Sequence, residues 1–206
     1  SKYKFEYEVE ADITQIFQKS GIIHAYAPIV AAGQNGCTLH YVVNKGVLAN
    51  RQLLLIDAGS EVEHYAADIT RTYARGEPTR RQRAIFDAVK EVQTFAMGQL
   101  KPGILLKDYE QSVHNFMGEK LRSLGLIKLI TNDNVSGYFP HATSHFLGLD
   151  VHDAGEYTRP LEAGMVLTVE PGIYVPDEGI GVRLEDDVLI TTNGIEVLTK
   201  KLPLEL

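Results

Sequence analysis

The sequence predicts an α+β domain in which helices cover one face of a mainly antiparallel sheet. Three observations lead to this fold class. Apolar residues recur at helical spacing over 8–20, again between 79 and 101, and over 106–123. Short runs rich in β-formers, bounded by Gly and Pro, lie in other parts of the chain. These helices and strands form separate blocks rather than alternating one by one, which is typical of α+β domains.

The sequence from residue 8 to residue 73 predicts one helix followed by extended segments. The helix over 8–20 ends at Gly21, and its apolar residues are Val9, Ile13, Ile16 and Phe17. From 25 to 43 the pattern changes to short extended segments broken by glycines. Residues 52–58 are predicted as a buried strand and 67–73 as a second one. Because only a turn at 60–65 separates them, we expect a hairpin.

Two long helices and a second group of strands follow. Pro78 stands at the expected first turn of one helix, and the segment 101–103 ends it. The next helix runs over 106–123 and stops at Gly125. After residue 146 the chain alternates turns with β-rich runs at 166–169, 182–184 and 188–191.

Composition excludes several classes of protein. With 206 residues and 44% hydrophobic content, the chain can bury a full core, and we expect one catalytic domain over 1–206. The net charge of −7 argues against nucleic acid as the main partner. Apolar runs are too short for a membrane span. The single cysteine, Cys37, and the lack of a leader pattern predict a cytoplasmic protein without an internal disulfide.

Five side chains in strand-like segments predict a metal centre: Asp57, Asp68, His145, Glu170 and Glu185. Several of the acids directly follow apolar residues, and a buried carboxylate needs a cation or many donors. If each pair of neighbouring strands forms a hairpin, Asp57 meets Asp68 and Glu170 meets Glu185. For any single acid, a surface or salt-bridge role would be the simpler interpretation.

The ligand set also limits the metal. Carboxylates with one imidazole favour Mn²⁺ and are compatible with Co²⁺ or Zn²⁺. Four carboxylates over-neutralise one divalent ion, so the residues predict two ions that hold a bridging hydroxide as nucleophile. Arg183, on the same strand face as Glu185, is expected either to orient Asp68 or Glu185 by a charged hydrogen bond or simply to offset the surplus of acidic charge. His141 and His152 are expected to contact substrate or surround the ligands.

These motifs resemble the catalytic domain of the Xaa-Pro aminopeptidases (aminopeptidase P), metallopeptidases of the pita-bread fold. The resemblance rests on NGCTLHY at 35–41, LIDAG at 55–59, DITRT at 68–72, HFLGLDVHD at 145–153, VEPGIY at 169–174 and GVRLEDD at 181–187. It implies a pita-bread fold with an internal pseudo-twofold. It also implies release of the N-terminal residue from peptides whose second residue is proline.

The resemblance assigns further roles. It implies a dinuclear, usually Mn²⁺, site in which Asp57 binds one ion, His145 and Glu170 the other, and Asp68 and Glu185 bridge. Residues matching His40, His141 and His152 contact substrate, and Arg183 supports the site. Glu170 would move a proton to the leaving nitrogen, and His152 would stabilise the oxyanion.

The chain departs from the family pattern at Ala142, where Gly is common. Family members also usually carry an amino-terminal domain that assists oligomer assembly, and we expect this domain to be absent here. The resemblance therefore leaves open whether this chain forms a homo-oligomer.

Four alternatives remain at this stage. Prolidase, which cleaves Xaa-Pro dipeptides, shares the metal set. Methionine aminopeptidase is less well matched by the segment GLDVHD at 148–153. Creatinase has the fold but works without metal, and some relatives are non-catalytic peptide-binding domains that lose metal ligands.

Overall fold

Two blocks of strands are separated along the chain by two long helices, as predicted. The computed structural model describes residues 2–206. The first block contains α1 (Glu6–Lys19), β1 (Ile23–His24), β2 (Ile29–Ala32), the 3-10 helix η1 (Gly33–Cys37), β3 (Leu53–Asp57), β4 (Ser60–Val62), β5 (Tyr65–Ala66) and β6 (Thr70–Ala74). The rest contains α2 (Arg80–Gln99), α3 (Leu106–Ser123), α4 (Asn132–Ser136), β7 (Val166–Val169), β8 (Gly172–Val175), η2 (Pro176–Glu178), β9 (Ile180–Arg183), β10 (Asp186–Thr191) and β11 (Gly194–Val197).

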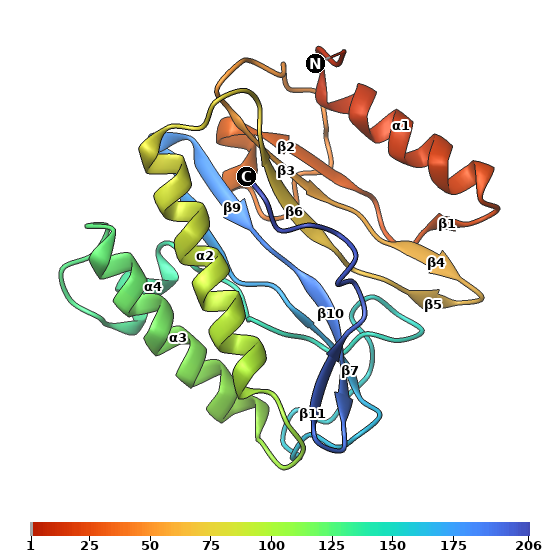
Figure 1. Ribbon diagram of the computed structural model, residues 1–206, viewed down its shortest axis with the longest axis vertical. Coiled ribbons are helices and arrows are strands. Elements are labelled where there is room, and N and C mark those ends of the chain that lie inside the picture. The colour runs from red at the N-terminus through yellow and green to blue at the C-terminus, as the bar shows by residue number, and fades with distance from the viewer. Residues whose placement is uncertain (1) are drawn as a thin grey trace.

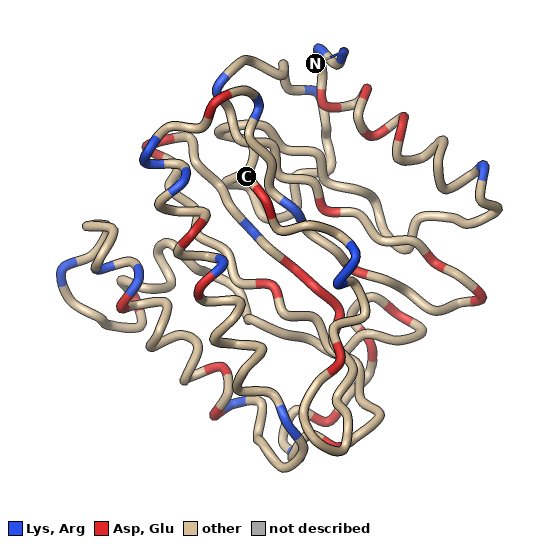
Figure 2. The backbone as a smooth tube through the Cα atoms, viewed as in Figure 1, with Lys and Arg blue, Asp and Glu red and all other residues tan. Residues whose placement is uncertain are grey.

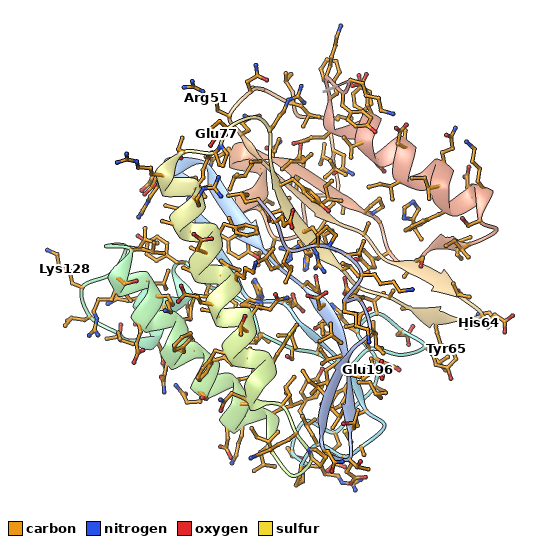
Figure 3. The ribbon with its side chains drawn as sticks, in the orientation of Figure 1. Arg51, His64, Tyr65, Glu77, Lys128 and Glu196 are labelled. Carbon is orange, nitrogen blue, oxygen red and sulfur yellow. The ribbon has the colours of Figure 1, made fainter. Side chains whose placement is uncertain are left out.

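All strand pairs within residues 2–206 are antiparallel, which confirms the predicted sheet type. The sheets have the orders β2-β3-β6, β11-β10-β7, β8-β9 and β1-β4-β5. The predicted hairpin is present, because β3 pairs with β6, but the expected turn between them is itself a small hairpin, β4-β5. Figure 3 shows His64 and Tyr65 at the tip of that small hairpin, pointing away from the rest of the molecule.

Helix α2 lies along β9, and α3 lies beside α2 on the side away from that strand, as Figure 1 shows. Their apolar stripes meet the strands of the second block in one core that includes Val89, Val113, Met117, Leu167 and Val182. A smaller core lies between α1 and β2. The long side-by-side helices and the buried strands therefore form the layered arrangement that the sequence predicted.

Helix boundaries follow the capping chemistry. Helix α2 begins after Thr79, whose side chain accepts a hydrogen bond from the Gln82 amide, so Pro78 lies just before the cap rather than in the first turn. Helix α3 has the predicted bounds. Helix α1 begins two residues earlier than predicted, at Glu6.

Sequence patterns missed several elements of the second block. Strand β8 begins at Gly172, where a turn was predicted, and all four of its residues are buried. A strand buried on both faces shows no alternation of apolar and polar residues, so periodicity does not reveal it. The short helix α4 and strand β11 were also missed. In the first block, β2 forms within the predicted extended region, whereas residues 38–46 form an irregular loop.

The two blocks join where β6 lies beside β9. The Thr72 hydroxyl donates to the Arg183 carbonyl at 3.0 Å, and the Glu185 amide donates to the Thr70 carbonyl at 3.0 Å. The Asp68 amide reaches a carboxylate oxygen of Asp187 at 3.2 Å. This seam brings the acids of the first block against those of the second. Within residues 2–206, no helix has both the length and the apolar character required to cross a bilayer.

Candidate metal centre

Each of the five predicted ligands lies at or next to the end of a strand. Asp57 is the last residue of β3, Glu170 directly follows β7, and Glu185 lies between β9 and β10. Asp68 precedes β6 by two residues, and His145 precedes a residue that bridges to β7. Asp57, Asp68 and Glu185 are only 7%, 6% and 1% exposed, so the alternative of surface acids is wrong for these three.

A cavity of about 360 Å³ lies at the seam between the two blocks. Its wall contains every residue that the sequence singled out for the site: His40, Asp57, Asp68, His141, His145, His152, Glu170, Arg183 and Glu185. Ala142, the departure from the family pattern, also lines it. Figure 2 shows the acidic stretch in the middle of the molecule where β9 passes into β10. The roles of these residues stay predictions, but their convergence is a property of the fold.

His145 stands between two carboxylates. Its Nε2 lies 3.2 Å from Glu170 and 3.5 Å from Asp68, while its Nδ1 lies 3.0 Å from the Phe146 carbonyl. With Nδ1–H donating to this carbonyl, Nε2 is the ring atom directed at the two acids, and it becomes available to a metal ion once its proton is lost. Burial opposes a charge on the ring, but the hydrogen bonds to Asp68 and Glu170 outweigh it and raise the pKa of His145 to about 10.

Arg183 supports a different acid from those expected. Its Nη2 donates to Asp57 at 2.5 Å, whereas its Nε lies 4.0 Å from Glu185. The prediction that Arg183 orients Asp68 or Glu185 therefore needs correction, because Asp57 is its hydrogen-bonded carboxylate. The same guanidinium donates to the Thr70 hydroxyl at 3.0 Å and to the Tyr174 hydroxyl at 2.9 Å.

Sequence reasoning missed two tyrosines at the site. The Tyr26 hydroxyl lies 2.5 Å from Asp57 and 2.6 Å from Asp68, so it spans the two acids of the first block. No spacing or motif in the sequence marks this residue. Tyr174 was within a quoted motif but had no assigned role, and its hydroxyl connects Arg183 to His141 Nε2, at 2.8 Å from the latter.

The histidines come from both blocks. His40 belongs to the irregular loop after η1, whereas His141 and His152 follow α4. The His152 ring lies 4.2 Å from that of His145, centroid to centroid. Burial lowers the pKa of His141, which favours its neutral form.

The donor chemistry of the cavity fits a divalent cation. Burial raises the pKa of Glu185 well above its ordinary value, and the charges of Glu170, Asp68 and Asp57 raise it further. Burial, followed by the charges of Asp57 and Glu170, also raises the pKa of Asp68, so the carboxylates of the cavity repel one another. Asp68, His145 and Glu185 each offer a ligand atom, and these atoms lie within 4.8 Å of one another. A bound cation would offset this repulsion and supply the missing partner.

Comparison with known proteins fits this geometry. The family model described as metallopeptidase family M24 matches residues 2–192. The chain belongs to metallopeptidase family M24. The expected resemblance is confirmed at the level of the family, and M24 membership agrees with a donor set suited to metal.

Relatives of known structure confirm the M24 fold. Aminopeptidase PepP of Pseudomonas aeruginosa has a TM-score of 0.94 and 41% identity over 98% of this chain and 50% of that one. Proline aminopeptidase P II of Yersinia pestis has a TM-score of 0.93 and 40% identity over 98% and 51%. The pita-bread fold class is therefore confirmed.

Among sequences, the Xaa-Pro aminopeptidase of Escherichia coli (strain K12) is 42% identical over 95% of this M24 chain and 48% of its own length. Human Xaa-Pro aminopeptidase 3 is 37% identical, and the match covers 98% of this chain and 42% of the human protein. The chain thus spans about half the length of the relatives it matches.

Proposed function

We propose that this chain is a dinuclear metalloexopeptidase domain that releases the N-terminal residue from peptides with proline in second position. One observation carries the proposal: four carboxylates and an imidazole from separate strand ends converge on one cavity that also contains three further histidines. The names of the M24 relatives support the choice of substrate, since Xaa-Pro aminopeptidases recur among them.

The proposed ligands follow from the family resemblance and from the position of each residue. Asp57 would hold one ion and His145 with Glu170 the other, while Asp68 and Glu185 would serve both. Mn²⁺ is the favoured metal for such oxygen-rich sites, with Co²⁺ or Zn²⁺ as compatible alternatives. When bound, such ions would supply Lewis acidity and activate a water molecule as the nucleophile at neutral pH.

The protein's own groups would bind the peptide and move protons. A bond to proline breaks only if the leaving ring nitrogen, which carries no hydrogen in the peptide, receives a proton. Glu170 is the proposed proton carrier, and the Thr168 hydroxyl holds its carboxylate at 3.1 Å. His152, whose ring lies beside that of His145, would stabilise the oxyanion, and His40 and His141 would contact the peptide from separate segments.

A peptide panel tests the proposal and separates it from prolidase. The Mn²⁺-loaded chain is assayed against Xaa-Pro dipeptides, Xaa-Pro-Xaa tripeptides and matched Xaa-Ala-Xaa tripeptides. We expect cleavage of the Xaa-Pro-Xaa tripeptides and little of the alanine controls. Cleavage confined to dipeptides would favour prolidase. If no peptide is cleaved, the assay is repeated after adding the region that the longer relatives have outside the part matched by this chain. Absence of cleavage by a metal-filled site in that assay would support a peptide-binding role.

Three further expectations belong to the same proposal. First, residues 1–206 would act as one catalytic domain. Second, the single cysteine, Cys37, fits a cytoplasmic, reducing location. Third, a homo-oligomer would be compatible with the fold. Metal analysis and sedimentation of the purified chain test the first and third directly.

A further inference from the structure

We propose that Glu6 is a positioning residue that anchors the loop 38–46 and thereby holds His40 at the rim of the cavity. Glu6 is the first residue of α1 and has no exposed surface. The proposal extends the proposed function, because it concerns how one wall of the same site keeps its shape, although its main readout does not require peptidase activity.

The Glu6 carboxylate is held by four donors from three segments. Its Oε1 accepts from the Ala32 amide at 2.7 Å and from Asn35 Nδ2 at 2.9 Å. Its Oε2 accepts from the Tyr41 hydroxyl at 2.8 Å and from the Gly46 amide at 2.6 Å. The Glu6 amide in turn donates to the Gly46 carbonyl at 3.0 Å. One side chain therefore ties the end of β2, η1 and the far end of the loop together.

These four partners are neutral, so the charge of Glu6 is balanced by hydrogen bonds and by the N-terminus of α1 rather than by a counter-ion. Donors that point at a buried carboxylate stabilise it only while they stay in place. A movement of the loop would remove two of the four donors, Tyr41 and Gly46, from this buried carboxylate, and this loss opposes the movement.

The anchor acts on His40 through its chain neighbours. Tyr41 directly follows His40, and Leu39 directly precedes it; both pack against a small apolar cluster that includes Tyr174. Leu39 and His40 line the cavity. Between the Tyr41 and Gly46 contacts, Asn44 is buried, and its side chain pairs with the backbone of β2 through the Val30 amide at 2.9 Å.

This network also explains two residues of the 35–41 motif that the proposed chemistry does not use. Asn35 and Tyr41 stand at opposite ends of the motif, and both donate to Glu6. A hydrogen bond from Asn35 to the Tyr41 hydroxyl at 3.0 Å closes the set. The motif therefore presents His40 and at the same time fixes the loop that carries it.

The experiment compares Glu6→Gln with the wild type by hydrogen exchange and by peptide kinetics. A glutamine keeps one acceptor oxygen but replaces the other with an NH₂ group, whose two N–H donors would face the donors that now bind Glu6. We expect amide exchange in 38–47 to become at least tenfold faster, with exchange in 166–190 unchanged. Affinity for Mn²⁺ should stay within twofold, because the proposed ligands lie elsewhere. KM for an Xaa-Pro-Xaa tripeptide should rise about five- to tenfold with kcat nearly unchanged.

Two further variants keep the test decisive if Glu6→Gln does not fold. Tyr41→Phe removes one donor and should change exchange and KM in the same direction but less. Gly46→Ala places a methyl group 2.6 Å from Glu6 Oε1 and should loosen the loop without altering any charge. The matched control is Glu91→Gln in α2, whose carboxylate accepts a hydrogen bond from Lys120 in α3; it should leave the loop unchanged.

Different results would contradict the Glu6 anchor and the proposed function. Loop exchange that stays at the wild-type rate in Glu6→Gln and Gly46→Ala overturns the anchor, and so does faster exchange spread evenly over the chain, which would indicate a merely structural role. Faster loop exchange in a chain that cleaves no peptide would overturn the proposed function and leave the anchor standing.

Discussion

Replacing Arg71 with methionine should destabilise the chain strongly, because its guanidinium closes a buried network at the seam. Arg71 donates to Asp186 at 2.6 Å and to the carbonyl of Glu185 at 2.5 Å, and it also reaches the carbonyls of Leu202 and Pro203. The Arg71 and Asp186 side chains are only 5% and 3% exposed. Methionine fills a similar volume but leaves the acid and the carbonyls without this donor.

Removing one partner of a buried pair costs about 3–5 kcal/mol, because the other charge stays buried. Asp186 keeps Thr199 and Gln93 as donors, at 2.5 and 3.0 Å, so we expect the lower end, about 3 kcal/mol. This is a large share of the ~5–15 kcal/mol by which domains are usually stable.

Urea unfolding of the metal-free chain in chelator measures this loss, provided that the slope of free energy against urea does not change. Adding Asp186→Asn to Arg71→Met should recover part of the stability, as a double-mutant cycle would report. Arg159→Met is the control, since its ion pair with Glu162 is exposed and should contribute less than ~1 kcal/mol. A loss below ~1 kcal/mol for Arg71→Met would refute the reasoning.

Three other predictions concern the thiol, a close contact and a surface ion pair. Burial raises the pKa of the Cys37 thiol to about 11, so alkylation by iodoacetamide at pH 8 should be much slower than for a free cysteine, and a normal rate would contradict this. Gly181→Ala places a Cβ 2.1 Å from a backbone oxygen of η1 and should destabilise the chain by about 1–3 kcal/mol in urea unfolding. Gly98→Ala, whose Cβ would meet open space in α2, should stabilise it by up to about 1 kcal/mol. Equal effects of the two substitutions would contradict this prediction. The hydrogen bond from Arg81 lowers the pKa of Glu178 below its ordinary 4.5, so the pair stabilises fully above pH 4.5 and less as pH falls through the lowered value. Thermal unfolding of Glu178→Gln should therefore differ from the wild type at pH 7 and converge with it near pH 3, and a constant difference would exclude the pair as its cause.

The sequence identified the residues of the site better than the contacts among them. Asp57 and Glu185 could be predicted because each follows an apolar strand, where an unpaired charge is unfavourable. The hydrogen bond from Arg183 to Asp57 could not, because it crosses from the second block of strands to the first. Tyr26 was missed because it is far from both acids in the sequence, and only the folded chain brings its hydroxyl between Asp57 and Asp68.

The fold shows a similar division. Helix α3 was predicted with its bounds because its apolar spacing is regular and Gly125 follows it. Strand β8 was missed because Gly172–Val175 is buried on both faces and begins at the glycine of a Pro-Gly pair that resembles a turn. The loop 38–46 was expected to be partly extended, but buried hydrogen bonds to Glu6 and Asn44 determine its path. Long-range polar contacts of this kind have no local pattern.

Metal binding by the stripped chain tests the central claim most directly. Calorimetric titration with Mn²⁺, checked by elemental analysis after dialysis, should give two ions per chain. Asp57→Ala and Glu185→Ala should abolish uptake, while Glu178→Ala, outside the cavity, should bind like the wild type. A wild-type chain that binds no divalent ion, or ligand variants that bind as many ions as the wild type does, would contradict the account.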